Sequence, residues 1–189
     1  MIIRRKENTE EMMNKMRKIF KKNDRAYFCN CDCYSFEDEF LVKLIKIFSD
    51  NETIVEEFLN RNSEKVYQFE ACIRFLVNKG YLVLDETYAK KIDFGTFLVK
   101  AINERFKIQI DKIQIDKKYE YYSEQINPNR KIKDKIIKFL LTESCIVELL
   151  QEKGYGLVNL YSAGDFYSYG VVTLDKIKQL EELFKDLTL

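Results

Sequence analysis

The stretch that decides the fold of this chain reads CIRFLVNKGYLVL at residues 72–84. Apolar residues at helical spacing come first, and Gly80 then ends the helix, because glycine readily adopts the left-handed conformation that follows many helices. The apolar run after Gly80 predicts a short strand. The second half of the chain repeats this order as CIVELLQEKGYGLV at residues 145–158, and a glutamate (Glu70 or Glu143) lies two residues before each cysteine. The sequence therefore predicts two helix–glycine–strand units.

Composition narrows the class of protein. The chain has 189 residues, of which 46% are hydrophobic and 33% charged, as is typical of a globular protein. No apolar run approaches the roughly 18 residues that a membrane span needs, and we expect no signal peptide and no membrane partner. Thirty-two basic and 31 acidic residues give a net charge of +1, which does not favour nucleic acid. Five cysteines without a secretory signal indicate reduced thiols and a cytoplasmic location.

The chain contains no histidine. This excludes a Ser-His-Asp triad, a Cys-His dyad and a His-ligated zinc site formed by this sequence alone. The phosphate-binding patterns G-x-x-x-x-G-K-[ST] and G-x-G-x-x-G do not occur either. An enzyme formed by this chain would have to use carboxylates, lysines, tyrosines or cysteines, and a cysteine- or carboxylate-based enzyme is a third hypothesis. We expect instead a protein that has no enzymatic activity and no cofactor, and that acts by binding.

The N-terminal segment is basic. Residues 9–23 have apolar side chains at helical spacing and predict an amphipathic helix. Residues 1–25 hold nine basic and four acidic side chains, a net charge of +5. One interpretation is an arm that uses Lys15, Lys18 and Lys22 to contact phosphates, a membrane surface or an acidic partner. The other, simpler for a surface helix, is a docked helix whose lysines face solvent.

Three cysteines alternate along a predicted strand at residues 26–34, namely Cys29, Cys31 and Cys33. The pattern C-x-C-x-C is also found in metal sites. In an extended strand, however, Cys29 and Cys33 lie about 13 Å apart, too far for one zinc ion unless the segment bends. Because cysteine also buries well, we predict a buried strand face and no metal site.

Helix-start signals precede and follow the central glycine. The pairs Ser35–Asp38 and Thr53–Glu56 match capping boxes, which open helices. Ser63 is the predicted N-cap of a third helix, which ends at Gly80. Thr96 is predicted to cap a further helix downstream.

Three short helices followed by Lys79-Gly80-Tyr81 and a strand resemble a winged-helix domain over residues 37–90. Residues 50–58 are also similar to the junction between the first two helices in peptide-binding winged helices of the PqqD type. That resemblance implies a leader peptide added as a strand beside the third helix. The exposed positions of this helix, Arg74 among them, are mixed in charge, which is unfavourable for duplex recognition.

The pentapeptide KIQID occurs at residues 107–111 and again at residues 112–116. Each copy alternates polar and apolar residues and predicts a strand, with a bulge or tight turn near Asp111. Residues 118–122 are expected to extend that strand. After a basic first turn, residues 130–153 predict a buried central helix, or two helices that meet midway.

The C-terminal part predicts a β-hairpin, with strands at residues 157–161 and 167–173, and then a helix at residues 174–187. The hairpin is rich in aromatic side chains. Either these side chains contact a protein partner or bases, or they alternate into the core. The aromatic residues concerned are Tyr161, Phe166, Tyr167 and Tyr169.

Together these patterns predict a helix-rich α+β protein with short antiparallel strands and one or two winged-helix-like units. Residues 1–35 form a basic helix and strand, residues 36–92 a winged-helix-like unit and residues 93–189 a second α+β unit, with a second winged-helix copy over residues 130–187. The expected function is regulation through a protein or peptide partner, as an adaptor or as a small inhibitor of a larger enzyme, of the kind that phages and mobile elements encode. The alternative is a winged-helix transcriptional regulator that binds nucleic acid. The candidate partner-binding residues are Lys15, Lys18, Lys22, Arg74, Tyr161, Phe166, Tyr167 and Tyr169.

Overall fold

The chain forms two compact units in the computed structural model. Unit 1 comprises Met1–Asp24 and Ala89–Lys153, and unit 2 comprises Arg25–Tyr88 and Gly154–Leu189. The units therefore interleave along the chain, whereas the sequence analysis placed them one after another. The structure describes residues 2–20, 26–28, 38–60, 68–85, 93–128, 131–162 and 166–185.

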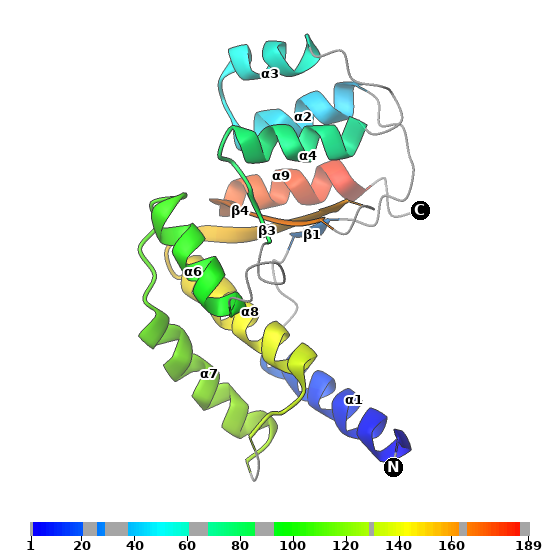
Figure 1. The fold of residues 1–189 in the computed structure, drawn as a ribbon, viewed down its shortest axis with the longest axis vertical. Helices are drawn as coiled ribbons and strands as arrows, with labels where there is room; N and C mark the ends of the chain where they lie inside the picture. The colour runs from blue at the N-terminus through cyan, green and yellow to red at the C-terminus, as the bar shows by residue number, and fades with distance from the viewer. Residues whose placement is uncertain are drawn as a thin grey trace. The chain divides into compact units, whose positions relative to one another are not determined.

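A four-stranded sheet forms the base of unit 2 (Figure 1). Strand β1 pairs in parallel with β3, whereas β3 with β4 and β4 with β2 are antiparallel. The predicted C-terminal hairpin is confirmed, and so is the α+β class. Of the predicted strand at residues 26–34, the structure describes three residues, and these form β1. In spatial order the strands are β1 (Ala26–Phe28), β3 (Tyr155–Ser162), β4 (Phe166–Thr173) and β2 (Val83–Leu84).

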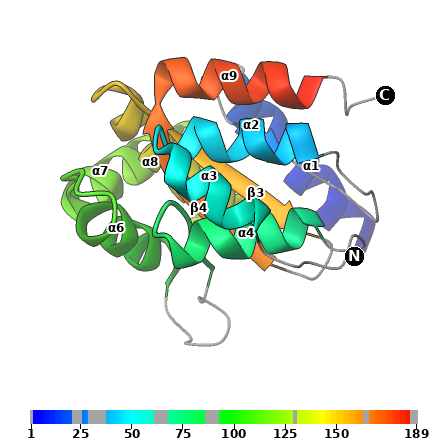
Figure 2. The same cartoon turned by 90° about the horizontal axis from the view of Figure 1, so that it is seen from above.

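The helices of unit 2 lie on one side of this sheet (Figures 1 and 2). Strand residues of this face, Val158, Leu160 and Val172, belong to one hydrophobic core with the helices. Alternation along the strands explains this, because every second side chain points to the same face. The helices are α2 (Asp38–Phe48), α3 (Glu52–Leu59), α4 (Gln68–Asn78) and α9 (Leu174–Lys185).

Two predicted helix starts are wrong by a few residues. Asn51, not Thr53, caps α3, and its side chain accepts a hydrogen bond from the Thr53 amide at 3.0 Å. Asp93, not Thr96, caps α6, because its carboxylate accepts from both the amide and the hydroxyl of Thr96 at 2.9 Å. In both cases an Asx side chain upstream satisfies amides that the helix leaves unpaired. The predicted N-terminal positions Ser35 and Ser63 lie outside the described residues.

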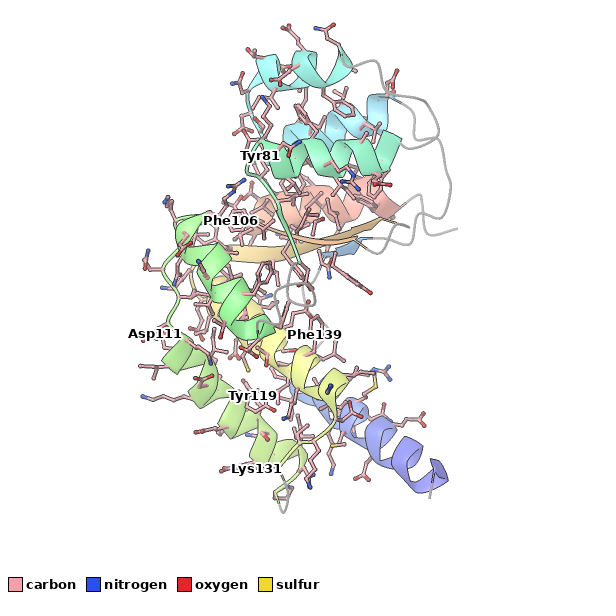
Figure 3. The ribbon with its side chains drawn as sticks, viewed as in Figure 1. Tyr81, Phe106, Asp111, Tyr119, Lys131 and Phe139 are labelled. Carbon is pink, nitrogen blue, oxygen red and sulfur yellow. The ribbon has the colours of Figure 1, made fainter. Side chains whose placement is uncertain are left out.

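The two helix–glycine–strand copies share their local geometry. Gly80 and Gly154 have φ angles of 86° and 82°, so both adopt the left-handed conformation, which was predicted for Gly80. The tyrosine after the first glycine also fixes the end of α2, because the Tyr81 hydroxyl donates to Ser49 Oγ at 2.8 Å (Tyr81 is labelled in Figure 3). Ser49 Oγ in turn accepts from the Asn51 amide at 3.2 Å.

All regular secondary structure in the described part of unit 1 is helical. The predicted central helix is confirmed as one continuous helix, α8, which packs against the other three. Met16 of the N-terminal helix packs with Ile126, Ile137 and Leu141 in a second hydrophobic core. The helix is therefore docked, as the simpler interpretation predicted. It begins at Ile2, earlier than predicted. The helices of unit 1 are α1 (Ile2–Ile19), α6 (Phe94–Glu104), α7 (Lys112–Ile126) and α8 (Lys135–Gln151).

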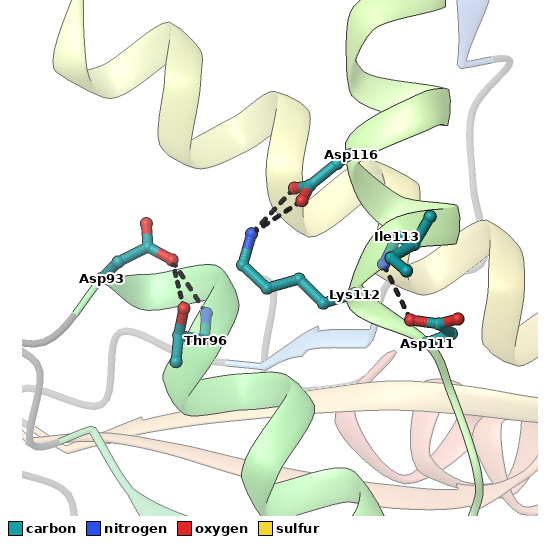
Figure 4. A network of polar contacts seen from close by, with 6 residues as sticks. All are labelled: Asp93, Thr96, Asp111, Lys112, Ile113 and Asp116. Atoms are coloured by element: carbon teal, nitrogen blue, oxygen red, sulfur yellow. Dashed lines mark hydrogen bonds and ion pairs between the residues drawn. The ribbon is translucent and has the colours of Figure 1, made fainter.

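The strands predicted at residues 107–116 and 118–122 are wrong. Residues 107–110 have no regular structure, and α7 begins at Lys112. The Asn103 side chain accepts a hydrogen bond from the Ile110 amide at 2.8 Å and donates one to the Ile110 carbonyl at 2.9 Å. Both backbone groups of Ile110 are therefore paired without a partner strand. Asp111 accepts from the Ile113 amide and caps α7, and Lys112 bonds Asp116 one turn further on (Figure 4). Two buried residues of α7, Ile115 and Ile126, lie at helical spacing and hold the helix in place.

Candidate functional site

An open groove of about 660 Å³ lies within unit 1, between α7 and the segment that leads into α8. We call it the α7–α8 groove. Its volume is in the range of ligand and peptide sites in proteins. Figure 3 labels Tyr119 on α7 and Lys131 on the segment before α8. The lining residues are Asp116, Tyr119, Glu120, Ser123, Glu124, Asn127, Pro128, Lys131, Ile132 and Lys138.

The α7 wall of the groove is acidic. Asp116, Glu120 and Glu124 recur every four residues, so a helix places their carboxylates on one face. Asp116 is neutralised by Lys112, whose Nζ lies 2.8 Å from one of its carboxylate oxygens. Glu120 and Glu124 form no ion pair with any residue that the structure describes. Two carboxylates of this wall are therefore available to a ligand.

The opposite wall is basic. Lys131 and Lys138 line it, and Ile132 between them is 3% exposed and belongs to the unit 1 core. Asp134 accepts from the Ile136 and Ile137 amides and so begins α8 at a defined point. Across the described ranges, neither lysine makes an ion pair or a side-chain hydrogen bond. Lysines and carboxylates thus line the same groove without forming ion pairs with each other.

A second hollow of about 260 Å³ shares Asp116, Tyr119 and Lys138 with the groove and extends it toward the start of α6. At its end Gly95 packs closely on α8, because a Cβ there would lie 3.0 Å from Thr142 Cγ2. Partial burial and the nearby Cys145 raise the pKa of Tyr119, so its hydroxyl stays protonated near neutral pH. That hydroxyl has no hydrogen-bond partner among the described residues, so it too can serve a ligand.

A polar seam behind the groove fixes α7 on α8. Lys118 Nζ lies 2.9 Å from Glu148 and 3.0 Å from Glu152. The Tyr122 hydroxyl donates to the Glu148 carboxylate at 3.1 Å. Burial and this hydrogen bond raise the pKa of Tyr122. For Lys118, partial burial alone would lower the pKa, but the bonds to both glutamates raise it. The seam therefore holds α7 against α8.

The chemistry offered by the groove is recognition by charges of both signs. Within the described ranges, no three Cys, Asp or Glu side chains come together as a metal site. Cys72 and Cys145 are buried, and burial raises the pKa of the Cys72 thiol far above neutrality, which makes it unreactive. Cys29, Cys31 and Cys33 lie outside the described residues.

The basic residues predicted as partner-binding come from different helices. Lys15 is 43% exposed and bonds Glu11 at 3.0 Å, and Lys18 is exposed on α1. Lys22 lies outside the described residues. Arg74 is exposed on α4 in unit 2, where Nη2 and Nε both lie 2.8 Å from Glu70. The described basic residues of this set therefore belong to different units, Lys15 and Lys18 to unit 1 and Arg74 to unit 2.

The predicted hairpin residues differ in exposure. Tyr167 is 49% exposed, which suits a contact residue. Tyr169 is fully buried, so its prediction as a contact residue needs correction, although it lies on the same face of β4 as Tyr167. Of Tyr161 and Phe166, the structure describes the backbone, which is paired in the β3–β4 ladder.

The sequence analysis missed the α7–α8 groove, because it assigned α7 as strand. A signal was present, since Ile115, Tyr119, Tyr122 and Ile126 follow the helical period.

Comparisons with protein-family models, with curated proteins and with solved structures found no significant match. In the part of the chain that the structure describes, no helix is both long and apolar enough to cross a membrane.

Proposed function

We propose that this chain is a non-enzymatic binding or regulatory protein that recognises a protein or peptide through the α7–α8 groove. The observation that carries the proposal is the groove itself, in which Glu120, Glu124, Lys131 and Lys138 face open space without ion-pair partners among the described residues. Unpaired charges of both signs suit a polypeptide, which can present both signs in return. An adaptor, or a small inhibitor of a larger enzyme, would act in this way.

The order of elements in unit 2 supports the adaptor role. Helices α2, α3 and α4 are followed by β2 and, later in the chain, by the β3–β4 hairpin, as in a winged-helix domain. Arg74 is paired with Glu70 on α4, which lowers the free positive charge that a DNA-recognition helix needs. We therefore propose a winged-helix-like unit that serves protein contact.

Affinity capture tests the function. Wild-type protein and the E120K/E124K variant would be used as baits in host lysate, with and without nuclease, and bound proteins would be identified by mass spectrometry. We expect a stoichiometric protein that survives nuclease and is lost from the variant. The matched control, E56K/E181K, makes the same change in charge at two exposed carboxylates of unit 2 and should retain the partner. Equal recovery by all three baits, or by none, would refute the proposal.

The charge of unit 1 favours a second candidate, nucleic-acid binding. Unit 1 holds 22 basic and 14 acidic residues, a net charge of +8, whereas unit 2 holds 10 and 17, a net charge of −7. A unit of this charge attracts polyanions even though the whole chain is nearly neutral. If phosphates are the target, the affinity for a labelled single-stranded oligonucleotide should fall steeply between about 0.05 and 0.2 M salt. A flat salt dependence would leave the protein partner as the supported function.

A further inference from the structure

The spacing of the free charges in the α7–α8 groove indicates the kind of segment that it holds. Glu120 and Glu124 are one helical turn apart on α7, so their side chains are neighbours about 6 Å apart. Lys131 and Lys138 stand on the opposite wall. On the basis of the proposed function, we infer that the partner segment is a mixed-charge helix. Its Lys or Arg residues, one turn apart, meet Glu120 and Glu124, and its Asp or Glu residues meet the two lysines.

A ligand of one sign would satisfy only half of this site. An acidic segment or a phosphate backbone would pair with Lys131 and Lys138 but would be repelled by Glu120 and Glu124. A purely basic segment would meet the opposite problem. Like charges brought together on binding oppose association, and opposite charges favour it. A segment that carries both signs is therefore the best match to the groove.

The length of the groove favours a helix over a small zwitterion. From Asp116 to Asn127 the α7 wall extends for about 16 Å, at about 1.5 Å per residue. That length corresponds to three turns of a helix laid alongside, at about 5.4 Å per turn. Tyr119 and Ile132 also line the groove, and the Tyr119 ring, which is the more exposed of the two, offers apolar contact. Laying one face of a partner helix into such a groove is a common mode of peptide recognition.

The test uses three labelled, alanine-rich helical peptides of roughly 15 residues, long enough for measurable helicity. The first has two lysines one turn apart and two glutamates on the other side. In the second all four are lysine, and in the third all four are glutamate. Fluorescence anisotropy at about 0.1 M salt, where charges still interact over about 10 Å, would give the affinities. We expect the mixed peptide to bind wild-type protein at least about fivefold more tightly than either single-sign peptide.

Variants show whether the groove is the binding site. E120K/E124K should weaken binding of the mixed peptide by about tenfold or more and strengthen binding of the all-glutamate peptide, a gain that only a folded groove can give. The E56K/E181K control should bind the mixed peptide within about twofold of wild type. Equal losses in both variants, or no preference for the mixed peptide, would overturn the inference. If the captured protein still depends on Glu120 and Glu124 in that case, the proposed function stands and the mixed-charge helix alone is wrong.

Discussion

Two glycines illustrate different constraints at the scale of single residues. In β4, a Cβ on Gly170 would lie 2.6 Å from Leu82 Cδ2 and 3.1 Å from the Tyr81 carbonyl oxygen. At Gly154 a Cβ would meet no atom within 4 Å, but φ is +82°. Gly170 is therefore required for space, and Gly154 is required for conformation.

Substitutions separate these two constraints. Gly170→Ala should lower the free energy of unfolding by about 1–3 kcal/mol, because a backbone carbonyl cannot move aside as a side chain can. Gly154→Ala should lower it by about 1–2 kcal/mol, because alanine is strained at positive φ. Gly154→Asn should recover part of that loss, since asparagine tolerates this conformation, whereas Gly170→Asn should be worse than Gly170→Ala. Urea denaturation measures all four values, and a neutral Gly170→Ala would contradict the close packing.

The sequence predicted one of these constraints and could not predict the other. Gly154 follows a helix and precedes a strand, which is a local pattern. The constraint on Gly170 comes from Leu82, which is distant in sequence and close only after folding. The cap of α3 was missed for a similar reason. Asn51 and Thr53 are both acceptable caps by residue type, but the contact of the Asn51 amide with Ser49 Oγ favours the earlier start.

At the scale of elements, α7 shows how a repeat can mislead. The KIQID pentapeptide alternates strictly, so a short window indicates a strand. Over the longer window of residues 112–126 the helical period is clear, and Asp111 provides an N-cap. A five-residue pattern is too short to distinguish these periods, and the groove was missed with the helix. In α8, by contrast, a long apolar stretch predicted helix, either as one helix or as two, and the structure has one.

The seam between α7 and α8 should make stability fall at alkaline pH. The pKa values of Lys118 and Tyr122 are both raised in the folded state, so above about pH 10 the folded protein holds more protons than the unfolded chain. The seam's contribution is therefore complete below the unfolded-state pKa values and is lost as pH rises through the folded-state values. Thermal unfolding followed by circular dichroism between pH 8 and about pH 11 measures this loss.

Two variants check the origin of that pH dependence. Tyr122→Phe removes the hydrogen bond to Glu148, so its stability should fall less steeply with rising pH than that of the wild type. Tyr121→Phe is the control, because Tyr121 is 61% exposed on the same helix. Its curve should match the wild type. If Tyr122→Phe also matches the wild type, Tyr122 is not a source of the alkaline loss.

At the scale of the whole molecule, the chain passes from unit 1 to unit 2, back to unit 1 and again to unit 2. Strand β2 pairs with β4, so Val83 meets Tyr169 across the entire second segment of unit 1. Local patterns predicted most of the helices and the hairpin, but they contain no information on pairing at this distance. The net charge of +1 is the sum of the opposite charges of the two units. These opposite charges are seen only when the residues are assigned to units by their contacts.

The interleaving predicts that residues 36–92, the winged-helix-like unit expected from the sequence, will not fold alone. The core around α2, α3 and α4 also needs Val158 and Leu160 of β3, Val172 of β4, and side chains of α9. A fragment without them would leave the sheet-facing sides of α2 and α4 in water, where a few short helices are not stable. We expect the amide signals of the fragment to show the narrow NMR dispersion of an unfolded chain. Adding a second chain that contains residues 154–189 should restore dispersed signals, whereas a folded fragment alone would show that the three helices form a complete core.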